Sequence, residues 1–190
     1  MIKFLDLYSQ YLSIKKEIDL AIEHSIKTTS FVGGDLVKKF EDKFANYLKV
    51  SFCVGCANGT DALEIAIESL DLEKGSEIIV PANSFVATSE AVTRSGHKVV
   101  FADIDPKTLS ISSKAVEKLI SKKTKAIIAV HLFGNPADMD KLKEITNNNS
   151  IYLIEDCSQA HGAEFQGMKI GSIGHIATFS FYPGKNLGAY

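Results

Sequence analysis

The sequence has few of the features that mark membrane, secreted or nucleic-acid-binding proteins. Its longest uninterrupted apolar run is Ala126–Val130, far below the roughly 20 residues that span a bilayer. Three cysteines are too few, and odd in number, for a disulfide framework. Lysine and arginine number 21 against 23 aspartates and glutamates, and no basic cluster is long enough to follow a phosphate backbone or an anionic membrane. These absences predict a protein with neither a nucleic-acid nor a membrane partner.

The N-terminal residues and the cysteines carry no targeting or metal signal. Asp6 places a carboxylate before any signal-peptide core could form, which predicts a cytoplasmic protein. Cys53 and Cys56 form a single C-x-x-C pair, whereas a zinc site needs a second pair or histidines at ligand spacing. A redox dithiol stays possible in principle, but segment 51–55 is typical of a strand that buries its cysteines as small hydrophobic residues. We therefore expect no metal site.

Apolar residues recur at helical and strand spacing along most of the chain. An amphipathic helix is expected over residues 35–48, behind the Gly33-Gly34 breaker. Short apolar strands that alternate with helices predict right-handed crossovers, and hence an α/β fold with a mainly parallel sheet between two helical layers. No linker divides the chain, so we interpret it as one domain, and the lack of a closing helix after the last strand indicates a fragment of something longer. Strands are expected at 51–55, 77–80, 98–102, 125–130, 151–154 and 177–181, and helices at about 60–71, 85–95, 112–121 and 137–147.

Residues just after the strands of such a sheet are the places to look for chemistry. Gly59 and Thr60 open a helix whose free backbone amides can seat a phosphate, although Thr60 can equally be a simple N-cap. Asp156 ends a buried strand, where an unpaired charge is expensive to desolvate. It therefore needs a cationic partner, unless it caps the following helix. Strand alternation turns its neighbour Glu155 to the opposite side, where we expect solvent or a helix.

One lysine and two histidines are further candidates. Lys185 lies in a tight turn between aromatic and glycine residues. Partial desolvation there would favour the neutral amine and make it a Schiff-base nucleophile; the alternative is an exposed turn lysine. His131 follows a strand and His161 follows Asp156 by five residues, so either could line a site. No histidine pair has metal spacing, and the G-x-S-x-G elbow of the α/β hydrolases is missing.

Three motifs together closely resemble the sugar aminotransferases of the DegT/DnrJ/EryC1/StrS family. They are NGTDAL at 58–63, EDCSQAHG at 155–162 and FSFYPGKN at 179–186, and they occur in the family's order and spacing. The resemblance implies a three-layer αβα PLP-dependent transferase (aspartate aminotransferase) fold. Residues 1–190 would form an N-terminal segment and most of the PLP-binding large domain. Members of the family are much longer, so the rest of the large sheet and the small C-terminal domain would be absent.

The resemblance also assigns roles around pyridoxal 5′-phosphate (PLP). Lys185 would hold the cofactor aldehyde as an imine and, once displaced, carry a proton. Asp156 would pair with the protonated pyridinium nitrogen, which supplies its missing cation. Gln159 would lie near the phenolic oxygen, and Phe85 would stack on the ring, with core packing as its alternative. The family's phosphate contacts match Gly59, Thr60 and Ser180.

The residues around the lysine resemble family members that act at C3 of a nucleotide-linked sugar. Members that aminate C4 tend to have a histidine before the proline and a threonine-rich stretch after the lysine, whereas here Tyr182 precedes Pro183. The resemblance therefore implies amino transfer from L-glutamate to a dTDP-3-keto-6-deoxyhexose, giving a dTDP-3-amino-3,6-dideoxyhexose, by a homodimer when full length. A C4-ketosugar or aminocyclitol aminotransferase of the same family, and a truncated non-catalytic remnant, are the alternatives.

Overall fold

The computed structural model describes residues 2 and 4–190. Met1 and Lys3, which belong to the opening stretch considered for a signal peptide in the sequence analysis, lie outside these residues. The chain divides into two compact units, Met1–Gly55 and Cys56–Tyr190. None of the helices in the described part of the chain combines the length and the hydropathy that crossing a bilayer requires.

The N-terminal unit contains helices α1 (Leu7–Lys27) and α2 (Gly34–Leu48). The Asp6 side chain caps α1 by accepting a hydrogen bond from the Ser9 amide at 3.2 Å. Gly33, with φ of 63°, precedes α2 in a conformation that favours glycine. Helix α2 agrees with the amphipathic helix expected over residues 35–48.

The strand predicted at 51–55 is wrong, because this segment has no regular secondary structure. Its Gly55 amide donates to Glu41 Oε1 at 2.8 Å rather than to a neighbouring strand. Phe52 is 86% exposed and Val54 80%, so these apolar side chains are not buried as those of a sheet strand would be. The cysteines also differ from the prediction: Cys53 is half-buried and Cys56 is exposed.

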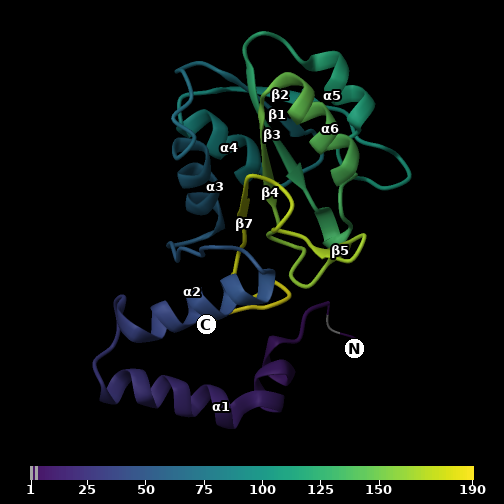
Figure 1. Ribbon diagram of the computed structural model, residues 1–190. Coiled ribbons are helices and arrows are strands. Elements are labelled where there is room, and N and C mark those ends of the chain that lie inside the picture. Colours follow the sequence, from purple (N-terminus) through teal and green to yellow (C-terminus); the bar gives the residue numbers. More distant parts are fainter. Residues whose placement is uncertain (1, 3) are drawn as a thin grey trace. The chain divides into compact units, whose positions relative to one another are not determined.

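The second unit is an α/β structure built on one parallel sheet (Figure 1). Helices α3 (Gly59–Glu68) and α4 (Val86–Arg94) cover one face, and α5 (Ser113–Leu119) and α6 (Met139–Asn149) cover the other. The predicted fold class is confirmed. The strands are β1 (Glu77–Pro81), β2 (Lys98–Ala102), β3 (Thr124–Val130), β4 (Tyr152–Asp156) and β7 (Ile176–Thr178); the short η1 (Leu132–Gly134) follows β3, and a hairpin of β5 (Glu164–Phe165) and β6 (Met168–Lys169) precedes β7.

The strand order β2-β1-β3-β4-β7 places a switch point between β1 and β3. The chain leaves β1 through α4 toward β2, and it returns through α5 to the other side of β1. Loops at the carboxyl ends of the strands diverge at such a point and leave a crevice for ligands. Strand β4 pairs with β3 and β7, so the ends of β3, β4 and β7 all lie at this edge of the sheet.

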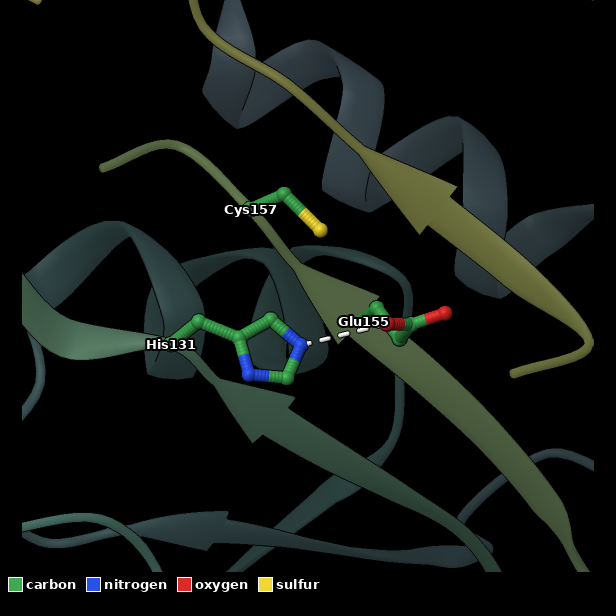
Figure 2. A group of neighbouring side chains, drawn as sticks. All are labelled: His131, Glu155 and Cys157. Carbon is green, nitrogen blue, oxygen red and sulfur yellow. Dashed lines mark hydrogen bonds and ion pairs between the residues drawn. The ribbon is translucent and has the colours of Figure 1, made fainter. Parts of the chain in front are cut away.

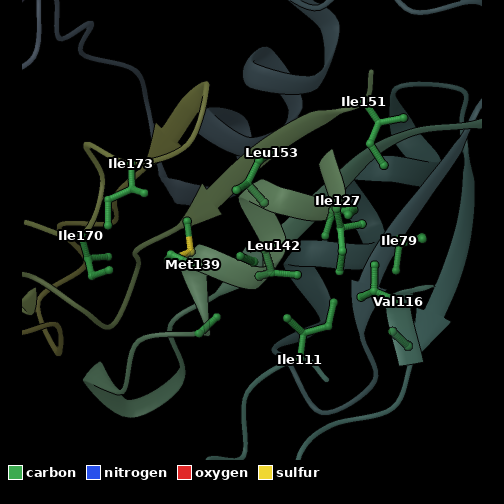
Figure 3. Close-up of a cluster of buried hydrophobic side chains, with 14 of the residues drawn as sticks. Ile79, Ile111, Val116, Ile127, Met139, Leu142, Ile151, Leu153, Ile170 and Ile173 are labelled. Carbon is green, nitrogen blue, oxygen red and sulfur yellow. The ribbon is translucent and has the colours of Figure 1, made fainter. Parts of the chain in front are cut away.

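An apolar cluster on each face holds the helices to the sheet. The cluster under α5 and α6 includes Ile127 and Leu142 (Figure 3), and the cluster under α3 and α4 includes Leu63 and Ile67. Burial of each such aliphatic side chain stabilises the fold by about 1.5–3 kcal/mol. Both faces of the sheet are therefore buried, which is why its strands are continuous apolar runs rather than alternating ones.

Candidate functional site

Two adjacent carboxylates end strand β4 on opposite faces of the sheet. Leu153 belongs to the cluster under α5 and α6, and Ile154 belongs to the cluster under α3 and α4. Strand alternation therefore turns Glu155 toward α5 and α6, and Asp156 toward α3 and α4. Glu155 thus turns to the opposite, helix-covered face, as predicted, but the alternative of solvent is wrong: its side chain is fully buried and accepts hydrogen bonds from backbone amides of a loop.

Glu155 accepts hydrogen bonds from the segment that leads into β7. Its Oε1 accepts from the amides of Ile173 at 2.8 Å and Gly174 at 2.6 Å. Its Oε2 accepts from the Gly171 amide at 2.9 Å and lies 3.2 Å from His131 Nε2. Although burial raises it, the bonds to His131 and to the glycine amides hold the pKa of Glu155 below its ordinary value. Glu155 thus anchors residues 171–174 to the sheet.

His131, Glu155 and Cys157 place possible metal-ligand atoms within 4.8 Å of one another (Figure 2). Hydrogen bonds already occupy two of these groups. His131 Nδ1 accepts from the Ala137 amide at 3.1 Å, which leaves the ring proton on Nε2 to be donated to Glu155. Burial, followed by the charges of Glu155 and Asp156, raises the pKa of Cys157 well above its ordinary value, so its thiol stays protonated. We interpret the cluster as a structural anchor.

Asp156 has only neutral hydrogen-bond donors around it. Its Oδ2 accepts from the Thr88 hydroxyl at 3.0 Å, and its Oδ1 accepts from the Ser158 amide at 3.1 Å. Among the described residues, no cationic side chain forms an ion pair with it. Asp156 is 5% exposed, so its negative charge is buried without a countercharge, which is costly. This environment suits a positively charged group of a ligand.

Gly59, Thr60 and Ser180 come together where α3 begins. The prediction of Thr60 as a possible N-cap is wrong, because Asn58 Oδ1 takes that role by accepting from the Asp61 amide at 2.9 Å. The amides of Gly59 and Thr60 then have no partner within the helix. A Cβ on Gly59 would lie 2.9 Å from the Cβ of Ser180, so only glycine permits this close approach. Free amides beside two hydroxyls form a seat for a phosphate dianion.

Gln159 and Phe85 each present a free chemical group. Gln159 Oε1 accepts from the Phe133 amide at 3.0 Å, which directs its Nε2 away from that bond and leaves it to donate to another oxygen. Phe85 precedes the first residue of α4, and its side chain is 69% exposed. Core packing, the alternative for Phe85, is therefore wrong, and its ring is open to a flat partner.

Lys185 is half-buried in the turn after β7. Its backbone amide donates to the Tyr182 carbonyl at 2.8 Å, and within the described residues its Nζ forms no ion pair. The ring of His161 lies 5.3 Å from that of Phe179 and 5.2 Å from that of Phe181. Burial, followed by the positive charge of Lys185, lowers the pKa of His161. His161 is thus a neutral neighbour of the lysine, whereas His131 belongs to the anchor.

Most of the predicted residues therefore lie at the carboxyl edge of the sheet, near the N-termini of α3 and α4. Lys185 and Gln159 reach this edge on the loops that follow β7 and β4. The contact that the sequence analysis missed is the Thr88 hydroxyl on Asp156. The four-residue spacing of Ser84 and Thr88 predicts two neighbouring hydroxyls where the predicted helix 85–95 begins, but it does not indicate Asp156 as their partner.

A family model and several known proteins match the chain. The family model described as the DegT/DnrJ/EryC1/StrS aminotransferase family matches residues 12–190. A pleiotropic regulatory protein of Geobacillus stearothermophilus is 42% identical over 189 residues, covering 100% of this chain and 51% of the relative. The UDP-2-acetamido-2-deoxy-3-oxo-D-glucuronate aminotransferase of Pseudomonas aeruginosa is 39% identical, covering 100% and 53%. The dTDP-3-amino-3,4,6-trideoxy-alpha-D-glucose transaminase of Streptomyces venezuelae is 38% identical, covering 100% and 50%.

A solved structure shows the same fold. The crystal structure of DesV from S. venezuelae, in complex with a ketimine intermediate, superposes with a TM-score of 0.97 at 38% identity. The superposition covers 100% of this chain and 51% of that one. The chain thus spans about half the length of the curated relatives it matches.

Proposed function

The chain belongs to the DegT/DnrJ/EryC1/StrS aminotransferase family, and from that premise we propose that the full protein is a PLP-dependent nucleotide-sugar aminotransferase. Its reaction converts L-glutamate and a dTDP-3-keto-6-deoxyhexose into 2-oxoglutarate and a dTDP-3-amino-3,6-dideoxyhexose. The observation that carries the proposal is Asp156, a buried carboxylate whose hydrogen-bond donors among the described residues are neutral and which lies at the same edge of the sheet as the phosphate seat.

The described residues fit PLP in charge and in shape. The amides of Gly59 and Thr60, with the Ser180 hydroxyl, would bind the phosphate. Asp156 would accept a hydrogen bond from the protonated ring nitrogen, which restores charge balance to its buried carboxylate. Two other groups would contact the ring: the Nε2 of Gln159 at the phenolic oxygen and the side chain of Phe85 on one face.

When bound, the cofactor would stabilise the negative charge that develops at the Cα of the amino donor. Asp156 would keep the ring nitrogen protonated, because its carboxylate is held as an acceptor by Thr88 and Ser158. Lys185 Nζ, half-buried and without an ion pair among the described residues, would take the proton from that Cα and return it. The neutral His161 beside it adds no second positive charge at this position.

The preference for C3 rests on the residues around the lysine and on two names. Tyr182 and Pro183, which precede Lys185, resemble the residues at these positions in family members that act at C3. The P. aeruginosa relative is named for a 3-oxo sugar and the S. venezuelae relative for a 3-amino sugar. These names differ in the nucleotide, UDP in one and dTDP in the other, so the position on the sugar is better supported than the nucleotide.

Cofactor binding is the first test. The purified full-length protein should be yellow with PLP, and borohydride reduction should fix the cofactor on Lys185 in a peptide map. A Lys185→Ala variant should yield no reduced adduct while it keeps the fold, as judged by circular dichroism. A wild-type protein that stays colourless with PLP would refute the enzyme assignment and favour the non-catalytic remnant.

A substrate panel is the second test. L-Glutamate is supplied with dTDP-linked and UDP-linked sugars that carry the ketone at C3 or at C4, and 2-oxoglutarate is measured. We expect the dTDP-linked 3-ketosugar to give the highest kcat/KM, and NMR of the product to place the new amine at C3. Amination at C4, or of a keto-cyclitol in preference to every nucleotide sugar, would replace the proposed substrate and leave the reaction class intact.

We also propose a homodimer for the full-length protein, an assembly that the family resemblance implies. Light scattering coupled to gel filtration should give a mass of two chains. A monomer that is fully active at the assay concentration would contradict this part of the proposal.

A further inference from the structure

We propose that Thr88, itself oriented by Ser84, is a positioning residue for Asp156 and so sets how the protein holds the ring nitrogen of the cofactor. The inference rests on the proposed function, and it adds two residues that the sequence motifs do not include. It concerns the first turn of α4, where a chain of two hydroxyl groups ends on the buried carboxylate.

The hydroxyl chain is short and largely shielded from water. The Ser84 and Thr88 oxygens are 2.8 Å apart, and the Thr88 oxygen is 3.0 Å from Asp156 Oδ2. Thr88 is 1% exposed and Asp156 5%. A hydrogen bond to a charged group in such an environment is roughly twice as strong as a neutral one. Removing the Thr88 hydroxyl would leave Oδ2 without this donor.

The direction of both bonds follows from the carboxylate. An ionised carboxylate only accepts, so Thr88 must donate its one hydroxyl proton to Asp156. The Thr88 oxygen can then act only as an acceptor toward Ser84, so Ser84 must donate to it. Ser84 therefore keeps the Thr88 proton pointed at Asp156, and its own loss should weaken the contact without abolishing it.

The two bonds to Asp156 fix the plane of the carboxylate. Ser158 holds Oδ1 through its amide and Thr88 holds Oδ2 through its hydroxyl, whereas a single bond would leave rotation about the side chain free. Thr88 also lies in the helix that begins just after Phe85, the residue proposed to stack on the ring. The same hydroxyl thus connects the group that would hold the ring edge to the helix that follows Phe85.

The experiment pairs a variant of the protein with a variant of the ligand. Thr88→Val removes the hydroxyl at nearly constant volume, Thr88→Ser restores it, and the full-length protein is titrated with PLP and with 1-deazapyridoxal 5′-phosphate, which has carbon in place of the ring nitrogen. We expect Thr88→Val to weaken PLP binding about tenfold and to leave binding of the deaza analogue unchanged. Thr88→Ser should bind PLP as the wild type does.

Two further variants complete the design. Ser84→Ala should also weaken PLP binding, but by a smaller factor than Thr88→Val. Because Ser84 is not part of the core, this variant tests the inference even if Thr88→Val fails to fold. Thr93→Val is the matched control, because its hydroxyl lies near the C-terminal end of the same helix and donates to the Ser89 carbonyl. Thr93→Val should leave the binding of both PLP and the deaza analogue unchanged.

Equal weakening of PLP and the deaza analogue by Thr88→Val would show that Thr88 only supports the fold, and would overturn the inference. Unchanged PLP binding in both Thr88→Val and Ser84→Ala would overturn it as well. In either case the wild-type protein would still bind PLP, and the proposed function would stand. Failure of the wild type to bind PLP would instead refute the proposed function.

Discussion

Replacing Glu155 by glutamine should strongly destabilise the second unit, because every group around this side chain is a donor. The backbone amides of Ile173 and Gly174 point at one oxygen, and the Gly171 amide and His131 Nε2 point at the other. A glutamine NH₂ would face two donors in either orientation. His131 cannot adapt by moving its proton to Nδ1, since that atom accepts from the Ala137 amide.

The magnitude follows from the buried donors that lose their acceptor. Each unsatisfied buried group costs about 1–3 kcal/mol, and hydrogen bonds to a charged group contribute more than neutral ones. We therefore expect Glu155→Gln to lose about 3 kcal/mol of unfolding free energy. With a urea m-value of about 1–3 kcal/mol per M, the unfolding midpoint should fall by at least about 1 M.

Urea titration followed by far-ultraviolet circular dichroism measures this midpoint. Glu144→Gln is the matched control, because Glu144 lies on the surface, where it pairs with Lys141; its midpoint should not move. A Glu155→Gln midpoint equal to that of the wild type would refute the anchor.

The wild type should also lose stability as the pH falls below about 4.5, the ordinary pKa of a glutamate, because the folded-state pKa of Glu155 is lower. Glu155→Gln should flatten that acid limb.

Three other results are expected. Gly59→Ala should weaken PLP binding, since its Cβ would lie 2.9 Å from that of Ser180; undiminished affinity in a titration would contradict the seat. The pKa of His161 in the folded protein is below 6.5, so the unfolded chain takes up a proton first as the pH falls, and stability should decline below about pH 6.5. In thermal unfolding, His161→Gln should reduce the dependence of the melting temperature on pH. An identical dependence in both proteins would contradict this expectation. A thiol reagent should label Cys56 in the native protein and the buried Cys157 only after unfolding; native labelling of Cys157 would show that β4 opens.

The strands of the sheet could be predicted where local pattern and final environment agree. Segments 77–80, 98–102, 125–130 and 151–154 are short apolar runs, and the structure forms a strand at each of them, the last beginning one residue later at Tyr152. Segment 51–55 has a similar composition but is not a strand. A strand needs a neighbouring strand for its hydrogen bonds and a surface against which one face is buried. The sequence of the segment alone does not show whether either is present.

The candidate site could be predicted only as far as single segments carry it. The free amides at the start of α3 and the buried position of Asp156 follow from local sequence, and the structure has both. The N-cap was predicted at Thr60 and lies at Asn58, because both residue types cap helices and only the backbone geometry decides which one does so. The Thr88 contact joins residues 68 positions apart, and no periodicity within one segment could reveal it.

The adjacent carboxylates of β4 show why this strand connects the fold to the site. Both carboxylate oxygens of Glu155 already accept hydrogen bonds from the anchor. Asp156 accepts from two neutral donors, and no cation among the described residues balances its charge. A shift of one residue in the register of β4 would bring Asp156 to the anchor and Cys157 to the site, leaving the anchor without its longer side chain and the site without its carboxylate. Because Glu155 anchors the segment that leads through β7 to Ser180 and Lys185, its loss should disturb both stability and the site. The loss of Asp156 should act mainly on the ligand.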